Sequence, residues 1–203
     1  MPFQRRVVVF VKEPRPGNVK TRLARDIGTV AATWWFRHQV GALLRRIGDD
    51  PRWETWLAVA PNYRGLRSRV WPAHLPRMAQ GAGDLGARMG RVFRALPPGP
   101  AIIIGADIPG IRAQHLAEAF GQLGRHDAVL GPAPDGGYWL VGLARGRQAA
   151  PAGLFDGVRW SSPHALADTV ASLRGQRIAY PATLRDVDTA ADLKALSSNR
   201  GSG

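Results

Sequence analysis

The sequence of 203 residues contains no cysteine, and this absence excludes several kinds of site at once. Without thiols, the chain forms no disulfide framework, no thiolate zinc site and no cysteine nucleophile. It also lacks the run of about 18 apolar residues that a membrane-spanning helix requires. The apolar run 7–11 near the N-terminus is too short for the core of a signal peptide. We therefore expect a cytoplasmic protein without a membrane partner.

Lysine is scarce as well, although the chain is strongly basic. The 28 basic and 15 acidic side chains give a net charge of +13, and only Lys12, Lys20 and Lys194 among the basic residues are lysines. The arginines are spread along the whole chain and form no block of the kind that a basic nucleic-acid-binding arm shows. The charge pattern therefore favours a small anionic ligand over nucleic acid as the partner.

What the chain does contain is typical of a globular α/β protein. Its length fits one compact domain, which we expect at 1–196, followed by a flexible tail at 197–203. Apolar β-branched runs alternate with helical periodicity, which predicts a single α/β domain with a mixed, mostly parallel sheet. Strands are expected at 6–11, 53–60, 77–80, 101–107, 128–130, 138–143 and 177–180. Helices are expected at 29–47, 84–96 and 112–123, from a cap at Ser161 or Ser162 to 173, and after Asp186 to Asp188, with loops at 12–19 and 61–76.

The loop after the first expected strand carries a cluster of cations. Lys12, Gly17, Lys20 and Arg22 lie in or just after it, within the segment 12–23 (KEPRPGNVKTRL). A loop with free backbone N–H groups and fixed cations, leading into a helix, is a suitable cradle for phosphates. The segment is neither a P-loop nor a dinucleotide fingerprint, and a solvated basic turn is the alternative interpretation.

Carboxylates stand at the ends of two expected strands. Asp107 follows the apolar run from 101, where an oxygen ligand suits Mg²⁺ that bridges substrate phosphates. Asp186 and Asp188 could complete a metal site with Asp107 if the two strand ends converge. The alternatives are helix N-caps at Asp107 and at Asp188, with Asp192 in the first turn of the last helix.

Two glycine-rich segments have both a structural and a functional interpretation. The segment 135–138 (DGGY) predicts a hairpin turn, and it also lets a backbone pack closely against a sugar or base. The segment 80–86 (QGAGDLG) predicts either a capping loop with Asp84 as N-cap or a flat surface for a nucleotide. Trp160 and Ser161 predict a partly buried aromatic residue at a helix cap. No histidine pair has metal-ligand spacing, and no serine hydrolase motif is present.

Taken in order, four segments resemble a known family. The segments 12–23, 83–89, 104–110 and 130–140 are similar to the glycosyltransferase-A-like transferases associated with radical-SAM and selenium-domain proteins. That family belongs to the nucleotide-diphospho-sugar transferase superfamily and is more distantly similar to phospholactate guanylyltransferase and molybdenum-cofactor guanylyltransferase. The resemblance covers about 7–193 and implies a Rossmann-like, three-layer α/β/α sandwich.

The resemblance also implies roles for individual residues. Lys20, Arg22 and Asp107 are expected to be catalytic, and Asp107 and Asp188 to hold Mg²⁺ or Mn²⁺. The residues expected at the nucleotide are Lys12, Gly17, Lys20, Arg22, Gln80, Gly83, Asp84 and Gly86. Those expected at the acceptor are Asp135, Gly136, Gly137, Tyr138, Trp160 and Ser161. Ala106 and Ile108 replace the small polar residue and cysteine often found around the family's aspartate, which removes polar contacts but leaves the metal role intact.

Two transfer reactions fit this resemblance. The segment 104–107 (IGAD) holds one aspartate rather than an Asp-x-Asp motif, and the cationic loop is richer than a diphosphate requires. We therefore expect transfer of a nucleotidyl group from a nucleoside triphosphate to a small phosphorylated or acidic acceptor, with release of pyrophosphate. The alternatives are a glycosyltransferase that uses a nucleotide-diphospho-sugar donor, and a non-catalytic nucleotide- or RNA-binding protein. The base, the acceptor and the oligomeric state do not follow from the sequence.

Overall fold

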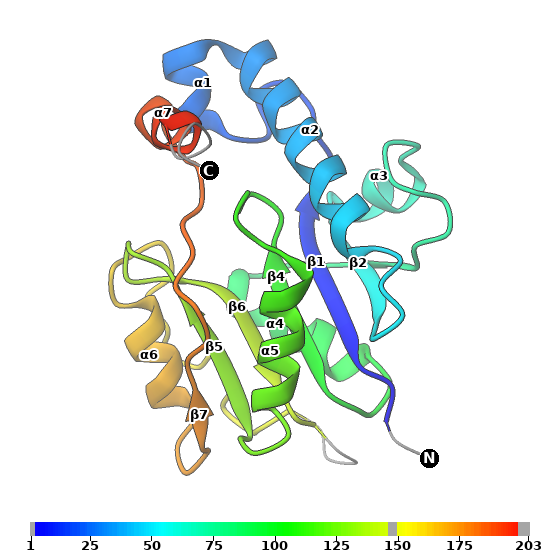
Figure 1. Ribbon diagram of the computed structural model, residues 1–203, viewed down its shortest axis with the longest axis vertical. Coiled ribbons are helices and arrows are strands. Elements are labelled where there is room, and N and C mark those ends of the chain that lie inside the picture. The colour runs from blue at the N-terminus through cyan, green and yellow to red at the C-terminus, as the bar shows by residue number, and fades with distance from the viewer. Residues whose placement is uncertain (1–2, 146–149, 199–203) are drawn as a thin grey trace.

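The computed structural model describes residues 3–145 and 150–198 and confirms a three-layer α/β/α sandwich (Figure 1). The strands are β1 (Arg6–Lys12), β2 (Glu54–Ala60), β3 (Arg77–Ala79), β4 (Ala101–Gly105), β5 (Ala128–Pro132), β6 (Tyr138–Leu143) and β7 (Ile178–Ala179). The helices are α1 (Thr21–Ile27), α2 (Thr29–Ile47), α3 (Asn62–Arg67), α4 (Leu85–Ala95), α5 (Ala113–Gln122), α6 (Ala165–Ser172) and α7 (Ala190–Ser198). In these described ranges, no helix has the length and apolar character needed to cross a lipid bilayer.

The sheet has the order β3-β2-β1-β4-β6-β5-β7 and is mixed but mostly parallel, as expected. Strands β3, β2, β1 and β4 form one parallel block, and β5 pairs in parallel with β7. Strand β6 runs antiparallel to both β4 and β5. The carboxyl ends of β1 and β4 therefore lie at the same edge of the sheet, where open α/β sheets bind ligands.

Helices bury both faces of the sheet, which explains why the central strands are apolar at nearly every position. In β1, Val7, Val9 and Val11 belong to one core cluster and Val8 to the other. The first cluster includes side chains of α2 and α5, and the second includes side chains of α4. Successive side chains of a strand point to opposite faces, so a strand covered on both sides has no polar alternation.

Two short helices were not expected from the sequence. Helix α1 has seven residues and α3 has six, and these lengths are too short for helical periodicity to show. Tertiary contacts hold them instead: Leu23 of α1 is fully buried, and Trp71 donates its indole N–H to the Gly65 carbonyl of α3 at 3.0 Å. Helix α3 therefore lies inside the segment 61–76 that was expected to be irregular, whereas residues 13–19 form a loop as expected.

Several element ends also differ from expectation. The last residue pair between β1 and β4 is Phe10 with Gly105, so β4 ends at Gly105. Asp107 therefore lies in the loop after the strand. Helix α6 begins at Ala165, and its N-cap is His164 rather than Ser161 or Ser162. The Ser162 hydroxyl instead closes the preceding turn by contacts with Arg159 and His164. Strand β7 is limited to two residues.

The start of α7 corrects the expected capping arrangement. Thr189 and Asp192 form a reciprocal pair, in which Asp192 accepts from the Thr189 backbone N–H at 2.9 Å and the Thr189 hydroxyl accepts from the Asp192 N–H at 3.3 Å. Asp188 is therefore free of the capping role. Helix α7 includes the first two residues of the tail expected at 197–203, and the rest of that tail lies outside the described residues. Helices α1 and α7 lie side by side at one end of the sheet (Figure 1).

Candidate functional site

The candidate site lies beyond the carboxyl ends of β1 and β4. The loop after β1 leads into α1, and the loop after β4 carries Asp107. A third segment, between β7 and α7, reaches the same place, because Val187 is buried and donates its backbone N–H to the Asp107 carbonyl at 3.3 Å. This contact brings the flanking Asp186 and Asp188 to the loop of Asp107.

These three aspartates form one acidic cluster. Their carboxylate oxygens lie within 4.8 Å of one another, and all three residues are partly buried. Three oxygen donors at this spacing match the ligand chemistry of a hard divalent cation such as Mg²⁺ or Mn²⁺. Asp186 stands two residues before Asp188, so an extended backbone directs both side chains to the same side.

Lys20 fills the space between two of these carboxylates. Its ammonium lies 2.6 Å from Asp107 Oδ2 and 2.6 Å from Asp188 Oδ1, and only 6% of its side chain is exposed. Burial acts to lower the pKa of Lys20, but Asp107 and Asp188 outweigh it and raise the pKa of the ammonium above its ordinary value. Lys20 therefore remains positively charged next to the acidic cluster.

The backbone of Lys20 is in the left-handed region, with φ 48° and ψ 47°, at the N-cap of α1. A non-glycine residue in this conformation costs about 1 kcal/mol or more, which the surrounding structure must offset. Arg22, two residues later, places its guanidinium 3.3 Å from Asp188 Oδ2 and keeps most of its side chain exposed. The loop after β1 thus delivers two cations to one cluster of carboxylates.

The surroundings of Asp186 change its acidity. Burial, followed by the neighbouring charges of Asp188 and Asp107, raises the pKa of Asp186 to about 6. The positive charge of Lys20 opposes this rise. Burial and nearby negative charge disfavour the ionised form of Asp186. A cation bound beside it would stabilise that form, which fits the donor set of a metal site.

Two adjoining cavities flank the acidic cluster. The first, called here the basic chamber, has a volume of about 570 Å³. It is lined by Phe10, Lys12, Asn18, Val19, Lys20, Thr21, Arg22, Phe36, Gly105, Ala106, Asp107, Ser161 and Asp188. Its cations come from the end of β1, the loop and α1. This chamber has the charge expected of a phosphate-binding site.

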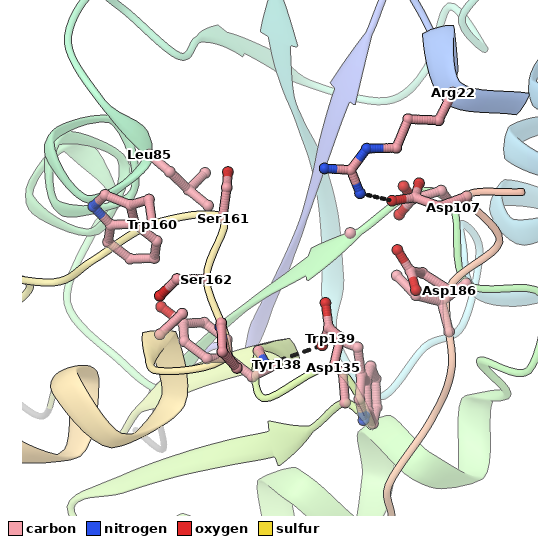
Figure 2. A pocket seen from close by; sticks show the side chains of 17 residues that line it. Arg22, Leu85, Asp107, Asp135, Tyr138, Trp139, Trp160, Ser161, Ser162 and Asp186 are labelled. Carbon is pink, nitrogen blue, oxygen red and sulfur yellow. Dashed lines mark hydrogen bonds and ion pairs between the residues drawn. The ribbon is translucent and has the colours of Figure 1, made fainter. Parts of the chain in front are cut away.

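The second cavity, called here the aromatic chamber, has a volume of about 470 Å³. It is lined by Arg22, Leu85, Gly105, Asp107, Ile108, Ala133, Asp135, Gly137, Tyr138, Trp139, Trp160, Ser161, Ser162, Pro163, Ala165, Asp186 and Asp188. Figure 2 shows Arg22, Asp107 and Asp186 on one side of this chamber and Leu85 and Trp160 on the other, with Asp135 and Tyr138 between them. The two chambers share Asp107 and Asp188, so ligands in both would meet at the acidic cluster.

The residues expected at the acceptor fall mostly in the aromatic chamber. Asp135, Gly137, Tyr138, Trp160 and Ser161 line it. Gly136 does not line it and has a packing role instead. Its φ of 83° is in the left-handed region, and a Cβ there would collide with the backbone of Pro163.

The residues expected at the nucleotide divide into two groups. Lys12, Lys20 and Arg22 line the basic chamber, whereas Gly17 lies in the loop before α1 and lines neither chamber. The segment 80–86 contributes only Leu85, to the aromatic chamber, and the expected residues Gln80, Gly83, Asp84 and Gly86 line neither.

Local contacts explain these residues of the segment 80–86. The buried Gln80 amide donates to the carbonyls of Val11 at 3.3 Å and Ala58 at 2.8 Å, which ties the end of β1 to β2. Asp84 caps α4 by accepting from the Ala87 N–H at 2.8 Å, as one of the two interpretations expected. A Cβ on Gly86 would stand 2.8 Å from side-chain atoms of both Phe155 and Trp160, so a glycine permits that close approach. The direct contact of these residues with a nucleotide stays a prediction.

The sequence analysis missed several lining residues. Leu85, Ile108 and Ser162 line the aromatic chamber, and Asn18 and Thr21 line the basic one. Asn18 and Thr21 carried a signal, because they are polar residues beside Lys20 in the cationic loop. Leu85 and Ile108 carried none, since an apolar residue after a loop also fits an ordinary core position.

Comparisons with known proteins agree with this architecture. A protein from Desulfovibrio desulfuricans G20, described as a nucleotide-diphospho-sugar transferase, is 30% identical and superposes with a TM-score of 0.87 over 98% of this chain and 89% of that chain. Rv0371c from Mycobacterium tuberculosis H37Rv, in complex with manganese, is 16% identical with a TM-score of 0.56 over 97% and 98%. CMP:2-keto-3-deoxy-manno-octonic acid synthetase in complex with CTP is 11% identical with a TM-score of 0.59 over 98% and 99%.

The two distant structures share the fold only, whereas the protein from D. desulfuricans G20 is similar in sequence over most of its length. No curated protein matches the sequence. The expected resemblance to the nucleotide-diphospho-sugar transferase superfamily is confirmed, and with it the general class of a nucleotide-dependent transferase. The model of the family described as uncharacterized protein conserved in bacteria, DUF2064, matches residues 43–162, more than half of the chain. The chain therefore belongs to the DUF2064 family.

Proposed function

We propose that the protein transfers a nucleotidyl group from a nucleoside triphosphate to a small acceptor, with the help of a divalent metal ion, and releases pyrophosphate. The observation that carries this proposal is the meeting of two chambers of different chemistry at the cluster of Asp107, Asp186 and Asp188. A cationic cavity on one side suits the phosphates, and a cavity lined by aromatic residues on the other suits an acceptor.

The basic chamber favours a triphosphate over a diphosphate. Lys12, Lys20 and Arg22 supply three positive charges to its walls. In nucleotidyl transfer the negative charge that develops on the departing pyrophosphate must be stabilised. The nucleoside diphosphate that departs in glycosyl transfer carries less charge. In this proposal Lys20 exchanges Asp107 and Asp188 for phosphate oxygens when the nucleotide enters, which its long side chain permits.

The acidic cluster fits Mg²⁺ or Mn²⁺ on the chemistry of its donors. Asp107 and Asp188 would hold the ion, with Asp186 as a third ligand. A divalent ion bound there supplies positive charge that neutralises and orients the phosphates. Rv0371c, which is similar in fold, is described in complex with manganese, and this supports the choice of a divalent ion.

The reaction then needs few further groups from the protein. An acceptor oxygen attacks the α-phosphorus, the bond from that phosphorus to the bridging oxygen of the β-phosphate breaks, and any acceptor proton passes to solvent. Lys20 and Arg22 stabilise the pyrophosphate oxygens, while the aromatic chamber holds the acceptor in line. Positioning and charge stabilisation account for most of the catalysis of phosphoryl chemistry.

Glycosyl transfer is the second candidate, because the relative from D. desulfuricans G20 is described as a nucleotide-diphospho-sugar transferase. In that reaction an acceptor oxygen bonds to a sugar carbon, the bond from that carbon to the diphosphate breaks, and the acceptor proton passes to solvent. The acidic cluster with a bound ion would hold the departing nucleoside diphosphate. The same two chambers would then house the nucleotide and the sugar with its acceptor.

Thermal unfolding in the presence of candidate ligands separates these functions, since a ligand that binds only the folded state raises the melting temperature. The four ribonucleoside triphosphates, UDP- and GDP-sugars and a short RNA are each added with and without Mg²⁺. We expect one triphosphate to stabilise the protein in a Mg²⁺-dependent manner. Stabilisation by a sugar nucleotide alone would favour glycosyl transfer, and a response to RNA alone would contradict both reactions.

A further inference from the structure

The charge on the walls of the aromatic chamber is the reverse of that in the basic chamber. Four carboxylates line the aromatic chamber, those of Asp107, Asp135, Asp186 and Asp188. Among the described residues, Arg22 is the only basic side chain that lines it, and its guanidinium is paired with Asp188 at 3.3 Å. In the proposed reaction Arg22 serves the pyrophosphate and a divalent ion would lie at the acidic cluster, so Asp135 is the carboxylate on these described walls that no cation offsets.

Asp135 is the carboxylate of this chamber that lies outside the acidic cluster. Its Oδ1 accepts the Gly137 N–H at 2.9 Å, within its own turn, and no described basic residue forms an ion pair with it. Figure 2 shows its side chain rising from the turn between β5 and β6 into the chamber. Its second oxygen is available to a ligand, and an ionised carboxylate can only accept hydrogen bonds.

The wall beside Asp135 offers ring surfaces rather than polar atoms. Tyr138 and Trp160 make an edge-to-face contact with their centroids 6.4 Å apart. The Tyr138 hydroxyl is occupied by Thr169, and the Trp139 indole N–H donates to the Ala182 carbonyl at 2.9 Å. The protein thus engages the polar groups of Tyr138 and Trp139 itself, and the indole nitrogen of Trp160 is buried, so ring carbons line the cavity.

Ser161 adds a polar group on the opposite side. It lines both chambers, and its hydroxyl bonds to no residue within 3–145 or 150–198. Its φ of 57° is in the left-handed region, which a serine rarely adopts. The hydroxyl is a donor and an acceptor at the border between the two ligands.

We propose that the acceptor is a neutral, hydroxyl-rich molecule of sugar-like chemistry that donates hydroxyl hydrogen bonds to Asp135 and lays an apolar face on Tyr138 and Trp160. This inference rests on the proposed function and names the substrate class of its second chamber. A hydroxyl oxygen of the acceptor forms the new bond to the α-phosphorus, pyrophosphate leaves, and the hydroxyl proton passes to water.

A phosphorylated or acidic acceptor, which the sequence analysis expected, conflicts with this chamber. A second negative charge beside Asp135 would be repelled, since Arg22 and the ion at the acidic cluster would already be engaged by the phosphates of the nucleotide. A neutral polyol avoids this penalty and uses the carboxylate as a hydrogen-bond acceptor. Asp135 is therefore assigned as the residue that sets acceptor specificity.

The experiment compares matched pairs of ligands: glucose with glucose 1-phosphate, N-acetylglucosamine with its 1-phosphate, and myo-inositol with its 1-phosphate. Calorimetric titration measures their affinity for the protein saturated with Mg²⁺ and an α,β-methylene ribonucleoside triphosphate. We expect a neutral member to bind about tenfold more tightly than its phosphate. Tighter binding of the phosphates, or no binding of any neutral member, would overturn the proposal.

Two variants assign the preference to Asp135. Asp135→Asn keeps the oxygen that accepts from Gly137 but removes the charge, and we expect it to reduce the preference for the neutral member about tenfold. Asp135→Lys should reverse the preference, and Asp156→Asn, which removes a charge outside both chambers, should leave it unchanged. An unchanged ratio in both Asp135 variants would also overturn the proposal.

The nucleotide titration made beforehand keeps the two proposals apart. If neither a triphosphate analogue nor a sugar nucleotide binds with Mg²⁺, the proposed function fails, whatever the sugars do. The sugars are then titrated against the nucleotide-free protein and followed by tryptophan fluorescence, since Trp139 and Trp160 line the chamber. If products show glycosyl transfer instead, the hydroxyl-rich acceptor stands, because a hydroxyl is the attacking group in either reaction.

Discussion

Val187 donates its backbone N–H to the carbonyl oxygen of Asp107 at 3.3 Å, and this bond joins the segment before α7 to the loop after β4. The side chain of Val187 is buried, so the aspartates on either side of it face the same cavity as Asp107. The acidic cluster is thus assembled from two segments that are distant in the sequence. Its function should depend on each carboxylate separately.

Removing one carboxylate of the cluster should weaken metal binding. We expect Asp107→Asn and Asp188→Asn each to lower the affinity for Mn²⁺ by about tenfold or more, because each loses a charged oxygen ligand. Electron paramagnetic resonance of free Mn²⁺ measures this affinity without nucleotide. Asp135→Asn serves as the control, since it removes a carboxylate of the same chamber outside the cluster. Equal affinity in all three variants and the wild type would contradict the assignment.

Lys20 should be essential for turnover but not for folding. Lys20→Met removes the ammonium that lies 2.6 Å from both Asp107 and Asp188. We expect pyrophosphate release to fall by about 100- to 1,000-fold, as when a group that stabilises developing charge is removed. Circular dichroism should show an unchanged fold. Arg125→Met removes one positive charge from the surface beyond α5, and a similar loss of activity there would point to a general effect of charge.

The apparent affinity for metal should depend on pH through Asp186. Its pKa is raised to about 6, so the proton competes with the metal below that pH and leaves above it. We expect Mn²⁺ affinity to be highest above pH 6 and to fall by up to about tenfold per pH unit below it. In the metal-free protein, the protonated carboxyl favours folding below its ordinary pKa of 3.8, and this contribution is lost as pH rises through about 6.

Titrations of Mn²⁺ between pH 5 and 8 measure this dependence. Asp186→Asn cannot lose a proton, so its affinity should change less with pH than that of the wild type. If the two profiles are parallel, the pH dependence belongs to another group.

The central part of the site was predictable because its residues follow strands with a strong signal. Strands β1 and β4 are apolar at nearly every position, which marked them as buried on both faces and placed Lys20 and Asp107 at one edge of the sheet. The cap at Asp84 was predictable for a similar reason, since it directly precedes a helical period.

The convergence of Asp186 and Asp188 on Asp107 was only a conditional expectation, because the segment between β7 and α7 has no period. Contacts distant in sequence set its path: the Ala182 carbonyl accepts from Trp139, the Leu184 N–H donates to the Pro132 carbonyl, and Val187 binds Asp107. The charge of the aromatic chamber was not predictable either, since its walls come from several separate segments. No local pattern encodes such contacts.

A variant of Gln80 tests whether the segment 80–86 contacts the nucleotide or stabilises the sheet. Gln80→Met keeps a similar length but leaves the carbonyls of Val11 and Ala58 without their buried donor. We expect a loss of about 1–3 kcal/mol in the free energy of unfolding, measured with urea. Nucleotide affinity, measured well below the melting temperature, should stay within about threefold of the wild type, since Gln80 lines neither chamber. A large loss of affinity at unchanged stability would show direct contact with the nucleotide.

Gly136 should be sensitive to the smallest side chain. Its φ of 83° disfavours any Cβ, and the added atom would meet the backbone of Pro163, which cannot rotate away as a side chain can. We expect Gly136→Ala to cost about 2 kcal/mol or more of unfolding free energy. The added methyl group would push the turn at 133–137 away from Pro163, and this should weaken acceptor binding because Asp135 and Ser161 lie close to these two segments.

Gly121→Ala is the matched control for this variant. Gly121 lies in α5, and a methyl group added to it would have no neighbouring atom within 4 Å. The free energy of unfolding of this variant should rise by about 0.5–1 kcal/mol, since alanine favours a helix more than glycine does. In urea unfolding, the two variants should change the free energy of unfolding in opposite directions if the turn at 133–137 packs tightly against Pro163. Equal stability of Gly136→Ala and the wild type would mean that this turn moves freely, and the wall formed by Asp135 would then be too loose to select the acceptor.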